Sequence, residues 1–159
     1  MDFIADQGKL LYMASGGGLM AWSNTSNSIQ ERFRQCSSKE DFLKLRQDFF
    51  DAVKAGTCKD LGFREHAYGM TKLFLIVWGK WFSGTQVIKS KGIQVATICP
   101  GFIDTDMVRP MDSKATKTIY QGAETPLFLI QNDRLKTNPS EQGGMFSDCN
   151  CRETGIWKN

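Results

Sequence analysis

Two short apolar runs separated by one long apolar segment are the feature that most constrains this fold. Residues 8–14 and 93–99 are mostly apolar and are each followed closely by glycine. Such runs are typical of strands that are covered on both faces, as in parallel sheets. Between them, residues 66–82 are apolar on most sides, which predicts a buried helix. This strand–helix–strand order predicts the α/β class, with a parallel sheet and helices packed on it.

Capping signals predict two further helices between the first strand and the buried helix. Ser28 with Glu31, and Ser37 with Glu40, each have the spacing of a capping box, in which a side chain accepts from a backbone N–H of the first turn. Gly56 is a suitable stop for the second helix. That helix has an apolar stripe, which we interpret as a core face: Phe42, Leu45, Phe49 and Val53.

The rest of the chain gives weaker signals. Residues 19–27 are rich in Ser and Asn and predict a loop. Residues 118–131 predict a helix interrupted near Pro126, since proline lacks the N–H that a helix interior uses. Residues 145–147 predict a last short strand. The chain shows no clear linker, so we expect a single domain over residues 1–159.

Composition excludes several classes of protein. The 159 residues have a net charge of only +3, which argues against nucleic acid as a partner. The longest apolar run, residues 73–78, is too short to cross a membrane, and the amino terminus lacks the apolar core of a signal peptide. Five cysteines, an odd number, then predict reduced thiols in the cytoplasm. No metal site is expected, because Cys149 and Cys151 have only the distant His66 to complete a ligand set.

Tyr68 and Lys72 form the first group of residues with catalytic chemistry. They are four residues apart on the predicted buried helix, so they share one face. A nearby ammonium favours the phenolate and lowers the pKa of a tyrosine, which could then protonate a carbonyl oxygen that accepts a hydride. The same spacing more often marks a half-buried tyrosine beside a solvated lysine.

Two further groups follow the two predicted strands. Ser15 stands at the end of the first strand, where open parallel sheets bind ligands, although a serine in a turn is also common there. The second strand is followed by Pro100 and Gly101, which allow a sharp turn close to a ligand. Thr105 adds a hydroxyl a few residues later.

Together these groups resemble the carboxy-terminal half of the short-chain dehydrogenase/reductase family, and above all its carbonyl reductase branch. The segments 67–72 (AYGMTK), 100–107 (PGFIDTDM) and 122–126 (GAETP) are similar to motifs of that branch, in the same order. The two predicted helices at about residues 28–56 resemble the helical insertion of that branch. The fold implied is the last three strands of a Rossmann-like parallel sheet with flanking helices. The resemblance covers the chain from about Gly8 to Trp157.

The resemblance also implies a reaction. Tyr68 would be the general acid, Lys72 would assist it and hold the nicotinamide ribose, and Ser15 would bind the substrate carbonyl. Pro100, Gly101, Ile103 and Thr105, with Tyr68 and Lys72, would contact the cofactor. The branch uses NADPH to reduce a small-molecule ketone, aldehyde or quinone.

One part of the family pattern has no match in this sequence. Members begin with a strand and the turn Thr-Gly-x-x-x-Gly-x-Gly, which wraps the cofactor pyrophosphate, and they carry a catalytic asparagine before the part matched here. We therefore expect a truncated chain that begins just before the family's fifth strand. The strand 10–14 would then have a bare edge, which predicts self-association or a partner chain there.

Residues 16–21 (GGGLMA) spell a dinucleotide-binding fingerprint, but we reject that interpretation. The fingerprint must open a helix inside a strand–helix–strand unit, and residues 22–27 are a poor helix start. Two alternatives to a reductase remain open from sequence. The chain could be a non-catalytic remnant that acts as an interaction module, or an unrelated small α/β binding module.

Overall fold

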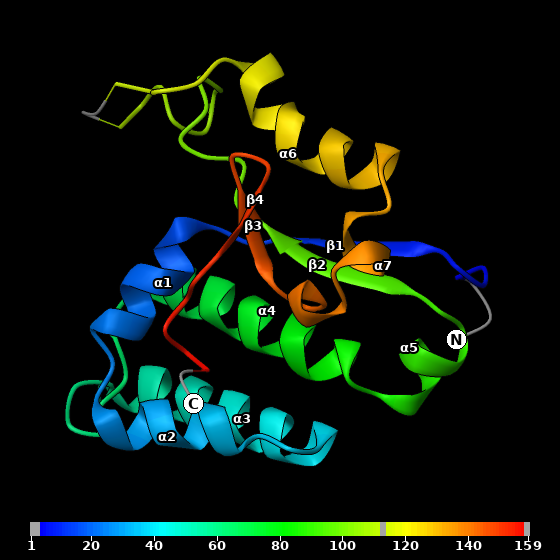
Figure 1. Cartoon of the computed structure of the whole chain (residues 1–159). Coiled ribbons are helices and arrows are strands. Elements are labelled where there is room, and N and C mark those ends of the chain that lie inside the picture. Colours follow the sequence, from blue (N-terminus) through cyan, green and yellow to red (C-terminus); the bar gives the residue numbers. More distant parts are fainter. Residues whose placement is uncertain (1–3, 112–113, 158–159) are drawn as a thin grey trace.

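The computed structural model describes residues 4–111 and 114–157 as a layered α/β structure (Figure 1). A four-stranded sheet has α6 on one face and α1, α4 and α5 on the other, and α2 and α3 lie beyond α4. In chain order the elements are β1 (Lys9–Met13), α1 (Gly16–Ser23), α2 (Asn27–Gln35), α3 (Lys39–Ala55), α4 (Ala67–Ser83), α5 (Gln86–Ser90), β2 (Gln94–Ile98), α6 (Ile119–Gln131), α7 (Arg134–Thr137), a 3-10 turn (Pro139–Glu141), β3 (Met145–Ser147) and β4 (Asn150–Arg152).

The sheet has the strand order β1-β2-β3-β4, and β1, β2 and β3 are parallel. The predicted α/β class and its three parallel strands are confirmed. The structure adds β4, which pairs antiparallel with β3 and which the sequence did not reveal. Asp148 and Cys149 join the two strands with φ of 52° and 59°, as a type I′ turn requires. Asp-Cys lacks the glycine that usually marks such a turn, so the hairpin gave no sequence signal.

Helix α4 is the centre of the hydrophobic core. Its residues Met70, Leu73 and Ile76 have no exposed surface. On its far side the Phe74 ring contacts Phe33 of α2 and Phe49 of α3, with ring centroids 5.1 and 6.0 Å apart. The two predicted helices therefore cover α4 with aromatic side chains. Their status as a family insertion stays a prediction.

The prediction of a loop at residues 19–27 is wrong, because α1 occupies most of that range. Ser15 caps α1, and its Oγ accepts a hydrogen bond from the Gly17 N–H. A Cβ at Gly18 would lie 2.9 Å from the backbone N of Leu73, so glycine lets α1 pack directly against α4. Tertiary contact thus forms a helix that local propensity disfavours. Because α1 opens at these glycines, the poor helix start no longer argues against a dinucleotide-binding fingerprint at residues 16–21. The next strand in the chain is nevertheless β2, which begins only at Gln94.

The caps of α2 and α3, and the helix α6 that contains Pro126, also differ from the predictions. The caps of α2 and α3 are Ser26 and Ser38, not Ser28 and Ser37, whereas Gly56 ends α3 at φ 70° as predicted. Helix α6 runs through Pro126 without a break. A proline removes one backbone donor, and the buried face of α6 (Gly122, Thr125 and Leu129) holds the helix together despite that loss.

Strand β1 is an edge strand of this sheet, since among the described residues it pairs with β2 alone. The bare edge predicted for this strand is therefore present in the structure. Among the helices in the described ranges, none combines the length and the apolar character that a membrane span needs.

We expect Gly18→Ala to destabilise the fold, although alanine favours helices. The new Cβ would lie 2.8 Å from Ile76 Cδ1 and 2.9 Å from backbone atoms of α4, so α1 would have to move away. Overpacking of this kind costs about 1–3 kcal/mol. Urea unfolding followed by circular dichroism measures the loss. Gly16→Ala is the matched control, because its Cβ meets only Cys99 Sγ at 3.9 Å. Equal stability of the two variants would contradict the packing argument.

Candidate active site

Tyr68 and Lys72 lie on the first turns of α4, on the face turned toward the end of β1. His66 caps the helix, and its Nδ1 accepts from the Gly69 N–H at 3.0 Å. The Lys72 ammonium lies 5.6 Å from the centroid of the Tyr68 ring and donates to the Met13 carbonyl oxygen at 2.9 Å. The Tyr68 side chain is half exposed. The shared helix face predicted from the spacing is therefore observed, and a bond to β1 fixes the lysine.

Ser15 lies beside this pair. It follows β1 and begins α1, and its Oγ accepts from the Gly17 N–H at 3.1 Å. Gly17 separates Ser15 from Tyr68, since a Cβ placed there would be 3.5 Å from Ser15 Oγ and 3.2 Å from Tyr68 Cε1. The structure thus gathers the three predicted catalytic side chains at the carboxyl end of β1, where parallel sheets bind ligands. We call them the Ser–Tyr–Lys cluster.

The segment after β2 lies at the same carboxyl edge of the sheet as the Ser–Tyr–Lys cluster. The Gly16 N–H donates to Cys99 Sγ at 3.1 Å, which places the Pro100–Gly101 turn next to Ser15. Gly101 has a φ of 91°, a conformation that favours glycine. These two residues of the predicted cofactor set therefore lie close to the Ser–Tyr–Lys cluster.

The other two predicted cofactor residues, Ile103 and Thr105, are placed differently. Ile103 packs against α6, since a Cβ at Gly122 would overlap Ile103 Cδ1. Its side chain stays partly exposed, and its backbone forms an isolated bridge with Lys117. The Thr105 hydroxyl donates to the Ile103 carbonyl oxygen at 3.4 Å.

Lys117 is a residue at the site that sequence reasoning missed. A Cβ at Gly101 would lie 2.8 Å from Lys117 Cδ and 3.2 Å from its Nζ, so this side chain covers the Gly101 turn. Its ammonium pairs with Asp148 in the turn between β3 and β4. Hydrogen bonds from Lys117, Ser147 and Arg152 hold the pKa of Asp148 at about 2. The partners are 31 residues apart, so no local pattern signals the pair.

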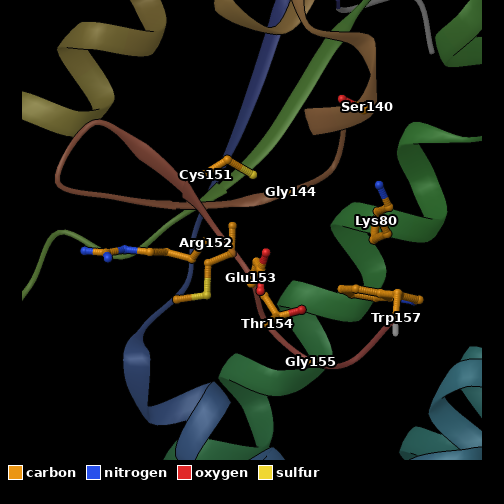
Figure 2. A pocket seen from close by; sticks show the side chains of 10 residues that line it. Lys80, Ser140, Gly144, Cys151, Arg152, Glu153, Thr154, Gly155 and Trp157 are labelled. Atoms are coloured by element: carbon orange, nitrogen blue, oxygen red, sulfur yellow. The ribbon is translucent and has the colours of Figure 1, made fainter. Parts of the chain in front are cut away.

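Metal-ligand groupings and cavities were compared with the position of the Ser–Tyr–Lys cluster over the described part of the chain. Within residues 4–111 and 114–157, no three His, Cys, Asp or Glu side chains are grouped to hold a metal ion. A cavity of about 380 Å³ opens between β4, the segment that follows it and α4. Figure 2 shows Cys151, Trp157 and Lys80 around it, and its lining includes none of the predicted site residues.

Comparison with known proteins finds relatives among the carbonyl reductases. The chain is 31% identical over 132 residues to carbonyl reductase (NADPH) 1 of Homo sapiens, covering 81% of this chain and 47% of the relative. It is 34% identical over 145 residues to carbonyl reductase (NADPH) 3 of Rattus norvegicus, covering 89% and 51%. The chain thus spans about half the length of the curated relatives it matches. No family model matches it.

A solved structure supports the fold. Salutaridine reductase of Papaver somniferum superposes with a TM-score of 0.67 at 18% identity, covering 90% of this chain and 46% of that one. The predicted resemblance to the carbonyl reductases and the predicted Rossmann-like fold are both confirmed.

The ion pairs of Asp148 predict an acid-sensitive contribution to stability. The folded-state pKa of about 2 lies below the ordinary 3.8, so the contribution is complete above about pH 4 and is lost as pH falls toward 2. We expect Asp148→Asn to lower the free energy of unfolding at pH 6, and the difference from the unmodified chain to shrink from pH 4 downward. Urea unfolding at pH 6, 4 and 3 measures this difference. The same charge change at exposed Asp60 is the control, and a difference independent of pH would contradict the assignment.

Proposed function

Since the chain is related over most of its length to the carbonyl reductases of the short-chain dehydrogenase/reductase family, we propose that it carries the catalytic face of an NADPH-dependent reductase. The substrate class is a small carbonyl compound, meaning a ketone, an aldehyde or a quinone. The observation that supports this most directly is the gathering of Ser15, Tyr68 and Lys72 at the end of β1.

In this proposal Ser15 and Tyr68 act on the carbonyl oxygen. Ser15 Oγ accepts from the Gly17 N–H, which leaves its own O–H to donate to the substrate. Tyr68 is half exposed beside it and gives its phenolic proton to the same oxygen as negative charge develops there. The two hydroxyls together orient the substrate against the rim of the sheet.

In this proposal Lys72 and the turn after β2 bind the cofactor. The bond to Met13 uses one N–H of the Lys72 ammonium, and the remaining two are free for a ribose hydroxyl. The backbone from Pro100 to Ile103 and the Thr105 hydroxyl complete the contacts. NADPH, when bound, supplies the hydride. The described residues fit the nicotinamide and ribose, whereas the sequence has no counterpart of the turn that wraps the pyrophosphate.

The second candidate function is a non-catalytic module that keeps the fold of the catalytic face. Within these 159 residues there is no Thr-Gly-x-x-x-Gly-x-Gly segment to grip the pyrophosphate. It would then act through its surface alone.

Titration of NADPH fluorescence separates the two candidates. We expect the chain alone to bind NADPH weakly, and a mixture with the amino-terminal half of a related reductase to bind it and reduce a small quinone. Failure of the mixture to bind or oxidise NADPH, with both halves shown to be folded, would support the non-catalytic module.

In such an active mixture, we expect Tyr68→Phe to reduce turnover at least 100-fold while NADPH binding stays within about threefold, because only the proton donor is lost. Steady-state oxidation of NADPH and fluorescence titration measure the two effects. Tyr120→Phe on α6, where the tyrosine is 88% exposed, is the matched control. Undiminished turnover of the Tyr68 variant would exclude the proton-donor role.

A further inference from the structure

A cavity of about 550 Å³ lies at the opposite end of α4 from the Ser–Tyr–Lys cluster. Its lining comes from the last turn of α4, from α5, from the amino end of β2 and from α7 with the 3-10 turn that follows it. Figure 1 shows α5 and α7 near the same end of β2, away from α1. Tyr68 and Lys80 stand near opposite ends of α4, about 18 Å apart along the helix axis. The cavity is therefore separate from the candidate active site.

The lining of this cavity is cationic. Lys80 of α4, Lys89 of α5 and Lys136 of α7 belong to it, and no Asp or Glu of the described residues does. The Lys80 ammonium donates to the Gln142 carbonyl oxygen at 2.9 Å, which leaves two of its three N–H groups for a ligand. Like charges around one hollow repel one another, and a bound anion offsets that repulsion. The lining therefore favours a negatively charged molecule.

The positions of the three lysines have a simpler explanation to compare with a site. Each lies in the last turn of its helix, where a cation offsets the negative end of the helix dipole. That effect is small for Lys89 and Lys136, because α5 has only 5 residues and α7 only 4. It also gives no reason for three helix ends to meet at one cavity.

Gln94, the first residue of β2, adds an uncharged polar group to the lining. The residue is 4% exposed, and its side-chain Oε1 has no hydrogen-bond partner among residues 4–111 and 114–157. A buried amide oxygen without a partner is costly, and native structures usually provide one. Rotation of the terminal amide exchanges its O and N atoms, so either can turn to a molecule in the cavity. An O–H or N–H of a ligand would supply the missing partner.

The rest of the lining suits a carbon skeleton. Ile88, Ile93, Leu135 and Pro139 contribute apolar surface between the lysines and Gln94. The volume is within the range of small-molecule sites, which are mostly apolar with a few polar groups that fix orientation. An organic molecule therefore fits this cavity better than an inorganic ion.

We infer that the cavity binds a small organic anion, which presents a carboxylate or a phosphate to the three lysines and an O–H or N–H to the Gln94 amide. Ammonium groups form charge-assisted hydrogen bonds with both kinds of anion, so the test uses one probe of each. The inference does not depend on the proposed reductase chemistry, because no residue of the Ser–Tyr–Lys cluster lines the cavity.

Two probes test the site: 4-hydroxyphenylacetate and 4-hydroxyphenyl phosphate. Each joins an anion to an aromatic body and an O–H, and amide chemical shifts of the isotope-labelled chain report where it binds. We expect at least one probe to bind with a Kd of about 1 mM or lower and to shift the Gln94 side-chain amide and the backbone amides of residues 88–94. Phenylacetate and phenyl phosphate, which lack the O–H, should bind about fivefold more weakly or worse.

Gln94→Leu tests the contact with the amide. We expect this variant to be at least as stable as the unmodified chain, because it removes a buried oxygen that has no partner. We also expect it to bind the O–H probe about as weakly as the probe without the O–H. Urea unfolding and the same titrations measure both effects. A less stable variant that still prefers the O–H probe would show that the amide is structural only.

The double variant Lys89→Gln and Lys136→Gln tests the charges. Both lysines are exposed, so the fold should tolerate the change, and we expect binding to weaken about tenfold or more. Lys54→Gln is the matched control. Lys54 is likewise an exposed lysine in the last turn of its helix, α3, but it lies outside the lining. We expect the control to bind as the unmodified chain does.

Three results would overturn the inference. The first is that neither probe shifts the amides of residues 88–94, which would leave the lysines with a role at helix ends only. The second is that shifts occur only near Ser15 and Tyr68, which would place the probes at the candidate active site. The third is equal weakening by the double variant and by Lys54→Gln, which would reduce the binding to nonspecific attraction.

Discussion

Close packing of two helices at glycine is the constraint on which the candidate site depends. Gly18 of α1 meets the backbone of α4 near Leu73, and Gly69 of α4 meets α1, where a Cβ would lie 3.0 Å from the Gly17 carbonyl oxygen. A side chain at either position would push the helices apart. Since Ser15 begins one helix and Tyr68 lies on the other, their approach is set by this contact and not by their own interactions.

Much of the fold followed from patterns that act locally. Continuous apolar runs predicted β1 and β2, and an all-round apolar segment predicted α4. Gly56 at positive φ ended α3 as its sequence position indicated. The elements that the sequence did not predict share a different cause. Helix α1 has poor propensity and exists because α4 covers it, and β4 exists because a turn without glycine folds the chain back onto β3. Both depend on partners distant in sequence, so local patterns gave no warning.

The residues of the candidate site also divide into those that local patterns predicted and those that depend on partners distant in sequence. The four-residue spacing of Tyr68 and Lys72 gave their shared face, and the strand ends gave Ser15 and the Pro100–Gly101 turn. Motif similarity added which roles to expect. Neither source indicated that Lys117 lies over Gly101 and pairs with Asp148, because that contact joins the segment before α6 to the β3–β4 turn. Motif order also did not show that the Ile103 side chain packs on α6.

The bond from Lys72 to the Met13 carbonyl oxygen ties the orientation of the ammonium to the main chain of β1. Any shift of that carbonyl oxygen would move the cation that lies 5.6 Å from the centroid of the Tyr68 ring. The position of the strand end and the surroundings of the phenol are therefore coupled through a single main-chain acceptor.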